Sequence, residues 1–207
     1  MQDVKKIVAL APRIDDSHKQ SAITFGGTSA FVSSWPYNPD GDPLLLVATI
    51  DCALLKGQAN LGALPDSGYI SIFSTYSKSD YFLENITYSG DPSELENIRA
   101  GYTFVTYSDN TSVEISPAGG IPKVLTDLVD TEVAAGEFPV FSMCSTKPPT
   151  GLVVPADISV DYEFGLQLYS SDFPEPYEDI FYLTDAVGYL FLEKSASGEG
   201  LFFVQSA

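Results

Sequence analysis

The sequence predicts an α+β protein that consists mainly of antiparallel β-sheet. Three observations predict it: most patterned runs are short and rich in β-branched or aromatic residues, helical periodicity is scarce, and most of the 16 Gly and 14 Pro fall between the runs. A chain of 207 residues with 44% hydrophobic residues buries roughly 70% of its unfolded surface. We therefore expect one folded domain over residues 1–207, with two possible sheet-rich lobes, 1–110 and 111–207.

Strand patterns account for most of the chain. Residues 44–50 form a continuous apolar run of the length of a buried strand. The other predicted strands are rich in β-branched and aromatic residues: 69–73, 101–107, 159–169, 189–193 and 201–205. The turn Gly198-Glu199-Gly200 predicts that the last two strands form a C-terminal hairpin. Residues 65–73 and 185–192 resemble each other, which is compatible with a duplicated sub-sheet.

Two segments carry helical patterns. In residues 122–135 the apolar positions 124, 125, 128 and 129 follow helical spacing, which predicts a helix. Residues 91–99 place Pro92 and acidic residues in a first turn, as a helix N-terminus prefers. The first twenty residues are expected to form a strand or a helix followed by a polar connection.

The charge of the chain restricts its partners. It has 10 Lys plus Arg and 28 Asp plus Glu, a net charge of −18, which repels phosphate backbones and anionic lipids. Direct nucleic-acid or membrane binding is therefore disfavoured, whereas a basic protein partner is favoured. The apolar run 7–11 is too short for a signal peptide, and no stretch reaches 18 apolar residues. We expect a cytoplasmic protein in which Cys52 and Cys144 are buried or idle thiols.

Common catalytic and cofactor motifs are missing from the sequence. Nucleophilic catalysis needs an imidazole base, and the single His, His18, lies in the polar segment 15–20. One His and two distant Cys do not supply a zinc site, and Phe25-Gly26-Gly27-Thr28 lacks the Lys of a phosphate loop. We expect no catalytic residue, metal or cofactor. A hydrolase that uses two carboxyl groups remains possible, because the chain has 28 acidic residues, but the sequence singles out no particular pair.

Two oxygen-rich segments invite comparison with cation sites. Residues 38–43 alternate oxygen ligands as a calcium loop does, but Pro43 occupies the position of the required Gly and Thr49 that of the bidentate Glu. A turn that leads into the strand 44–50 is the better interpretation. Asp161 and Glu163 would face the same side of a strand, which more often means a solvent-exposed face than a cation site.

An acidic segment is the best candidate for a binding surface. Between Lys147 and Lys194 there is no Lys or Arg, and Phe173, Tyr177 and two prolines alternate with acids near the centre. Such a stiff loop can bind a basic partner at low ordering cost; the alternative is an ordinary solvated loop. The candidate partner-binding residues are Asp161, Glu163, Asp172, Phe173, Glu175, Tyr177, Glu178 and Asp179.

Motifs in the first third of the chain resemble one family. The motifs are Phe25-Gly26-Gly27, Trp35-Pro36, Gly41-Asp42-Pro43-Leu44, Ile50-Asp51 and Leu64-Pro65-Asp66-Ser67-Gly68. This pattern resembles the YwqG-like proteins, the DUF1963 family; residues 180–205 resemble its last strands more weakly, and Thr49 replaces the usual Gln. The resemblance implies a bacterial protein of two sheet-rich halves, and carries over no catalytic residue. Because Trp35-Pro36 follows the Gly-Gly turn and precedes the buried strand from Leu44, we expect Trp35 to be structural, with its indole capping one sheet.

Three functions remain open at this point. The resemblance implies that such proteins occur beside secreted bacterial toxins, where acidic neighbours act as immunity proteins. We therefore expect a non-catalytic immunity protein that neutralises a basic toxin by direct stoichiometric binding. A carboxylate-based hydrolase and a housekeeping protein that binds a small ligand or another partner are the alternatives.

Overall fold

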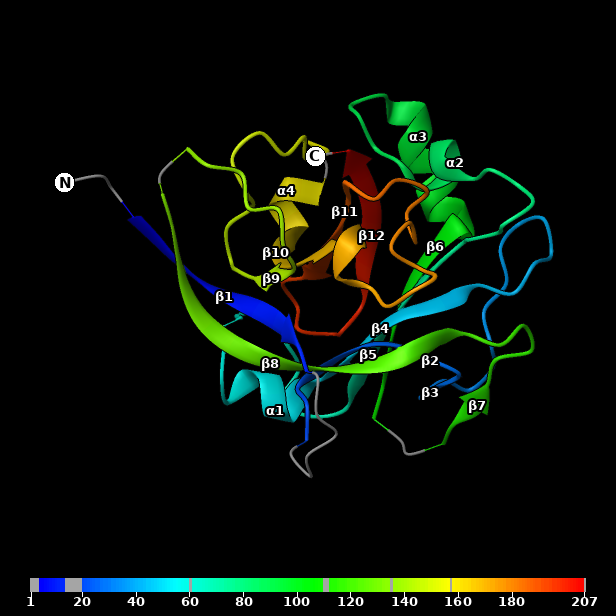
Figure 1. Cartoon of the computed structure of the whole chain (residues 1–207), viewed down its shortest axis with the longest axis horizontal. Coiled ribbons are helices and arrows are strands. Elements are labelled where there is room, and N and C mark those ends of the chain that lie inside the picture. The colour runs from blue at the N-terminus through cyan, green and yellow to red at the C-terminus, as the bar shows by residue number, and fades with distance from the viewer. Residues whose placement is uncertain are drawn as a thin grey trace.

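The computed structural model describes residues 4–13, 20–59, 61–109, 112–134, 136–156 and 158–206. Ten strands form one antiparallel sheet in the order β12-β11-β10-β9-β1-β8-β2-β4-β5-β6 (Figure 1). The strands are β1 (Val4–Pro12), β2 (Ile23–Gly27), β4 (Leu45–Asp51), β5 (Tyr69–Ser74), β6 (Thr103–Ser108), β8 (Ile121–Ala134), β9 (Met143–Cys144), β10 (Tyr162–Tyr169), β11 (Ala186–Glu193) and β12 (Gly200–Ser206). The predicted mainly antiparallel α+β fold is confirmed.

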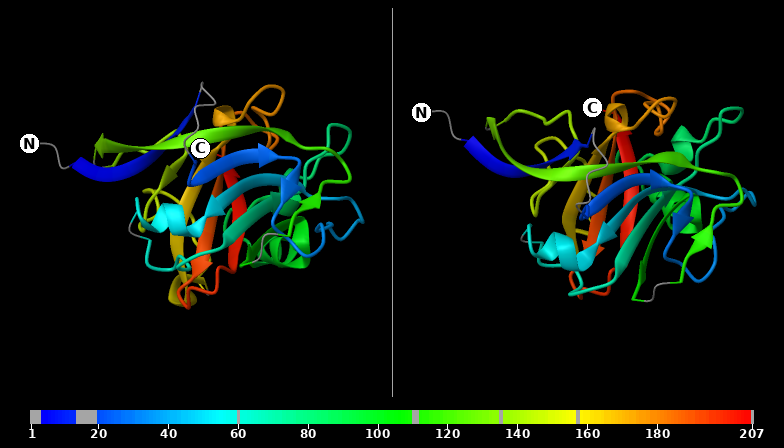
Figure 2. Two further views of the ribbon diagram at one scale, coloured as in Figure 1. Left: turned by 90° about the horizontal axis from the view of Figure 1, so that it is seen from below. Right: turned by 60° about the horizontal axis from the view of Figure 1, so that its bottom comes forward.

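The sheet curves until its two ends meet. The further views show β12 approaching β6 across the molecule (Figure 2), and the Thr103 hydroxyl at the start of β6 donates to the Phe202 carbonyl of β12. The predicted C-terminal hairpin is present as the antiparallel pair β11–β12. A separate two-stranded sheet joins β3 (Ser29–Ala30) to β7 (Glu114–Ile115). The fold is therefore a nearly closed sheet with a small attached ribbon.

Short helices connect the strands: α1 (Cys52–Lys56), α2 (Leu83–Ile86), α3 (Pro92–Asn97) and α4 (Ile158–Asp161), with a π-helical turn η1 (Ile98–Tyr102) and a 3-10 turn η2 (Ser170–Asp172). The predicted helix in residues 91–99 is confirmed as α3. Its N-terminus has a capping box, in which Asp91 accepts from the Ser93 amide at 2.9 Å and Glu94 accepts from the Asp91 amide at 3.2 Å. None of the described helices is long and apolar enough to cross a membrane.

The helix predicted over residues 122–135 is wrong, because most of this segment forms β8. Strand β8 pairs with β1 from Val4↔Ala134 to Pro12↔Thr126, and with β2 at Thr24↔Leu125. The segment contains many β-branched residues, which suit a strand, and pairing on both edges outweighs the helical spacing of its apolar residues. The N-terminal segment, left open between strand and helix, forms the strand β1.

The two segments that resemble each other occupy equivalent places in the sheet. Residues 65–73 lead into and form most of β5, and residues 185–192 do the same for β11; each strand is the second from an end of the sheet. Strand β8 lies near the middle, between β1 and β2. Strands from both predicted lobes are thus hydrogen-bonded into one continuous sheet.

The main core fills the inside of the curved sheet. Phe25 of β2, Ile50 of β4 and Phe202 of β12 are at most 1% exposed and belong to one apolar cluster. A smaller cluster lies under loop 28–44 on the outer face and consists of Ala30, Val32, Trp35, Leu44, Leu46 and Phe73. Residues 38–43 form the expected turn, closed by hydrogen bonds from the Gly41 amide to the Asn38 carbonyl and from the Asn38 amide to the Asp42 carbonyl.

Trp35 anchors loop 28–44, as expected. Its indole Nε1 donates to the Leu44 carbonyl at 2.8 Å, and its ring meets Phe73 edge-on at a centroid distance of 5.3 Å. The side chain is buried.

We predict that Trp35→Ala lowers the free energy of unfolding by about 3–5 kcal/mol, because it removes a buried aromatic ring and leaves a cavity. Urea unfolding monitored by circular dichroism measures the loss. Trp35→Phe should lose less, because a ring remains against Phe73. Equal stability of the parent and Trp35→Ala would contradict the assigned role.

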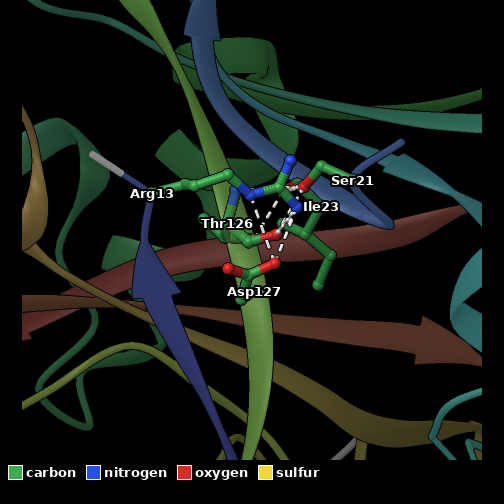
Figure 3. A network of polar contacts seen from close by, with 5 residues as sticks. All are labelled: Arg13, Ser21, Ile23, Thr126 and Asp127. Atoms are coloured by element: carbon green, nitrogen blue, oxygen red, sulfur yellow. Dashed lines mark hydrogen bonds and ion pairs between the residues drawn. The ribbon is translucent and has the colours of Figure 1, made fainter. Parts of the chain in front are cut away.

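A polar network joins β1, β8 and β2 (Figure 3). The Arg13 guanidinium donates to Asp127 Oδ1 through Nε at 3.2 Å and Nη2 at 2.7 Å, and Nη2 also lies 3.4 Å from the Thr126 carbonyl. The Ser21 hydroxyl donates to the Thr126 carbonyl at 2.8 Å, and the Thr126 hydroxyl donates to the Ile23 carbonyl at 2.6 Å. These bonds fix the point at which the two sets of strands meet.

We predict that Arg13→Met lowers the free energy of unfolding by about 1.5–3 kcal/mol, the range for hydrogen bonds to charged groups. The Arg13 side chain is 8% exposed, so water replaces its partners only in part. Asp127→Asn, which keeps an accepting oxygen, should cost less in the same urea titration. Two variants as stable as the parent would show that the network does not hold the junction.

Candidate functional site

The predicted acidic segment forms a loop after β10. This loop, residues 173–183, lies beside residues 76–82, which follow β5: the Tyr182 hydroxyl accepts from the Ser77 amide at 3.0 Å. Glu175 and Asp179 are exposed, and Tyr177 and Glu178 are half-buried. Four of the eight predicted residues therefore lie on one surface loop.

Two predicted residues at the start of this loop, Asp172 and Phe173, do not form part of its exposed surface. Phe173 is 3% exposed, stacks on Phe25 at a centroid distance of 4.9 Å and meets Phe181 edge-on. It is a core residue, so the prediction that Phe173 lies on the partner-binding surface is wrong. Asp172 accepts from the Ser142 amide at 2.7 Å, and burial raises the pKa of its carboxyl group.

Asp161 and Glu163 lie at the other end of β10. Asp161 ends α4, so the predicted strand over residues 159–169 begins only at Tyr162, and the expectation that both acids share a strand face is wrong. Glu163 Oε2 accepts from the Ala63 amide at 3.1 Å and holds the loop after α1. The length of β10 separates these acids from Asp172 by roughly 20 Å, so the eight residues do not form one surface.

A cluster of tyrosines completes the surface loop. Tyr76 contacts Tyr177 and Tyr182 at centroid distances of 5.8 and 5.5 Å, and Tyr81 meets Tyr182 edge-on at 5.1 Å. They border an open groove of about 530 Å³, here called the tyrosine groove, which is lined by Tyr76, Ser77, Lys78, Ser79, Asp80, Tyr81, Pro176, Asp179 and Tyr182. The groove is therefore built by two loops that are about 100 residues apart in the chain.

Hydrogen bonds order the groove. The Tyr76 hydroxyl donates to Asp179 Oδ1 at 3.1 Å, and burial together with this carboxylate raises the pKa of Tyr76 to about 12. The Lys78 ammonium lies 5.7 Å from the centre of the Tyr177 ring, a cation–π contact. The sequence predicted Tyr177 and Asp179 as binding residues but not Tyr76, Tyr81 or Tyr182. The polar segment 77–80, which has a tyrosine on each side, was the pattern that could have indicated them.

A second depression lies on the outer face of the sheet. This hollow of about 400 Å³ is lined by Gln20, Ser21, Thr24, Gly26, Gly27, Thr28, Ser29, Phe31, Thr49, Asp51, Leu54, Tyr69, Val113, Lys123 and Leu125. The hollow therefore brings together Gly26, Gly27, Asp51 and Tyr69, which the sequence pattern assigned to separate turns and strands. We call it the outer hollow.

Among the described residues, neither cysteine has the lowered pKa of an activated nucleophile. Cys52 and Cys144 are free and buried, as expected, and burial raises the pKa of both thiols to about 12. Within the described ranges no three His, Cys, Asp or Glu side chains are grouped as a metal site. His18 lies outside the described residues.

The geometry defines a curved antiparallel sheet protein that presents two surface depressions, one rich in tyrosine and one rich in hydroxyl groups. A family model for a domain of unknown function, DUF1963, matches residues 24–188. The chain belongs to the DUF1963 family, and the match includes the middle of the chain, where the sequence motifs had no counterpart. No curated protein matches the chain.

We predict that Asp172→Asn changes how stability depends on pH. Because the carboxyl pKa is raised in the folded state, the folded protein binds more protons than the unfolded chain between the unfolded and the folded pKa. The parent therefore loses stability relative to Asp172→Asn as pH rises through this window, and the difference levels off above it. Urea unfolding of both proteins from pH 4 to 8 measures this; a difference independent of pH would contradict it.

Proposed function

We propose that this protein is a non-catalytic binding protein that occupies a basic protein partner stoichiometrically through the tyrosine groove. In its specific form, the protein is an immunity protein that neutralises a secreted bacterial toxin. One observation carries the proposal: four tyrosines contact one another at the surface, and the acids Asp80, Glu175, Glu178 and Asp179 lie on the same two loops.

Tyrosines in this arrangement are suited to protein recognition. Each offers a large apolar ring with a polar hydroxyl and has few rotatable bonds, and tyrosine is enriched among residues that dominate binding energy. Tyr81 is 63% exposed, whereas Tyr76 and Tyr182 are held by hydrogen bonds to the neighbouring loop. A partner therefore meets a surface that is already ordered, which reduces the entropy cost of binding.

Charge selects the class of partner. The net charge of −18 attracts a basic protein over long distances, and acids at the edge of the groove add local attraction. Lys78 is the one basic residue among those that line the groove. Toxins that act on nucleic acid present basic clefts, which are complementary to such a surface.

The alternative of a carboxylate-based hydrolase has weaker support. It requires a carboxyl group of raised pKa in an open cleft. Among the described acids, Asp172 is the one whose carboxyl pKa is raised, and it binds the Ser142 amide and lines neither depression.

We predict that Glu175→Ser, Glu178→Ser and Asp179→Ser together slow association with the partner, most strongly at low salt. The first partner to test is the product of the adjacent gene, by pull-down and then by stopped-flow binding at two salt concentrations. The matched control replaces Asp130, Glu132 and Glu137, exposed acids on β8 and the turn after it, and removes the same charge. Equal slowing by both triple variants would place the contact elsewhere.

We predict that Tyr81→Ala weakens the complex by about 2 kcal/mol or more, the range for a dominant interface residue, and leaves the fold intact because the ring is largely exposed. Calorimetric titration measures the affinity. Tyr37→Ala, which removes a ring that is 54% exposed outside the groove, is the control. If neither the neighbouring product nor any basic protein binds, the proposed function is wrong.

A further inference from the structure

The outer hollow exists because one half of an outer sheet face is left uncovered. Loop 28–44 covers the other half, where Trp35, Leu44, Leu46 and Phe73 form their small core. Over β2, β4 and β8 no such cover is present among the described residues, and the face carries Thr24, Thr49 and Leu125, which are direct neighbours across the strands. Such neighbours have side chains about 5 Å apart on the same face.

The hydroxyl groups at the base of the hollow are unengaged. Among the described residues, those of Thr24 and Thr49 have no hydrogen-bond partner, although both residues are half-buried. The next residue of this row, Ser71, pairs with Thr49, is fully buried, and its hydroxyl also has no partner in the described part of the chain. The hydroxyls of Thr24 and Thr49 line the hollow, and each can donate one hydrogen bond to a ligand and accept others from it.

The walls of the hollow differ in character. On one side, Phe31 stacks on Tyr69 at a centroid distance of 3.8 Å and offers an apolar surface. On another side the backbone itself approaches, because β2 has an irregular register between Phe25 and Gly27, and Gly26 has a positive φ of 64°. A Cβ at Gly26 would lie 2.8 Å from the Ile121 Cβ, so only glycine lets β2 and β8 pack this closely at the edge of the hollow.

The charged residues of the hollow balance. Among the described residues that line it, Asp51 is the one acid and Lys123 the one base. Asp51 Oδ1 accepts from the Leu54 amide at 3.0 Å, and its other oxygen has no partner among the described residues. The Lys123 ammonium likewise has no described partner. One acceptor and one donor of opposite charge favour a ligand without net charge, and the total charge of −18 disfavours an anion.

We propose that the outer hollow binds a neutral polyhydroxylated molecule of monosaccharide to disaccharide size. Ligand hydroxyls both donate and accept, as the Thr24 and Thr49 hydroxyls do; Asp51 accepts and Lys123 donates, and the stacked Phe31–Tyr69 pair contacts the C–H face of the ligand. The volume of about 400 Å³ is within the usual range for small-molecule sites. The proposal does not depend on the tyrosine groove, which is formed by other loops.

The test is saturation-transfer NMR and calorimetry of the full chain with glucose, galactose, N-acetylglucosamine, maltose and cellobiose. We expect saturable binding of at least one sugar with a Kd of about 1 mM or tighter. The double variant Thr24→Val and Thr49→Val keeps shape and strand preference and should weaken binding at least about tenfold. Thr106→Val, in the same cross-strand row but on β6 outside the hollow, should bind like the parent.

A folding control and a second variant decide between loss of the site and loss of the fold. Thermal unfolding shows whether the double variant folds; if it does not, Lys123→Met, which changes an exposed side chain on β8, should weaken binding several-fold. The proposal is wrong if no sugar binds saturably, or if binding survives in the folded variants. It is also wrong if glycine or inorganic phosphate binds at the hollow more tightly than every sugar. Binding of the protein partner should be unchanged in all these variants, which separates this site from the proposed function.

Discussion

Strand β8 is hydrogen-bonded to β1 along one edge and to β2 along the other, and every longer-range feature of the molecule depends on this double pairing. Without β8, strands β2, β4, β5 and β6 would form one sheet, and β1, β9, β10, β11 and β12 another. The Arg13–Asp127 contact and the Ser21 and Thr126 hydroxyls hold the junction from within. Because the joined sheet is long, it can curve until β6 meets β12.

Curvature gives the two sides of the sheet different roles. The inner side is closed by its own ends and is filled by apolar side chains, among them a chain of ring contacts from Phe25 to Phe202 through Phe173 and Phe181. The outer side is covered where loop 28–44 folds back through Trp35. It is also covered over β11 and β12, where Tyr88, α3 and η1 pack on a second apolar cluster. The two proposed binding surfaces therefore lie on the uncovered part of the outer face and on loops at the strand ends, where side chains can change without disturbing the core.

The two depressions suit different kinds of binding. The tyrosine groove is open, aromatic and flanked by acids, which fits a large basic surface. The outer hollow has a volume of about 400 Å³ against about 530 Å³ for the groove, and its free hydroxyls and balanced charge fit a small neutral molecule. A protein with both can bind a partner on one surface and a small molecule on another, and the residues that line the groove and those that line the hollow do not overlap.

The sequence by itself determined the mainly antiparallel fold, most strand positions, the capped helix α3, the turn at residues 38–43 and the acidic character of the surface, because these depend on local propensity and composition. Only tertiary structure decided that residues 121–134 form a strand, since pairing on both edges outweighs local helical spacing. It also turned Phe173 inwards, separated Glu163 from Asp179, and brought Tyr76 and Tyr81 to Tyr182. These outcomes depend on contacts between residues distant in the chain, which no local pattern encodes.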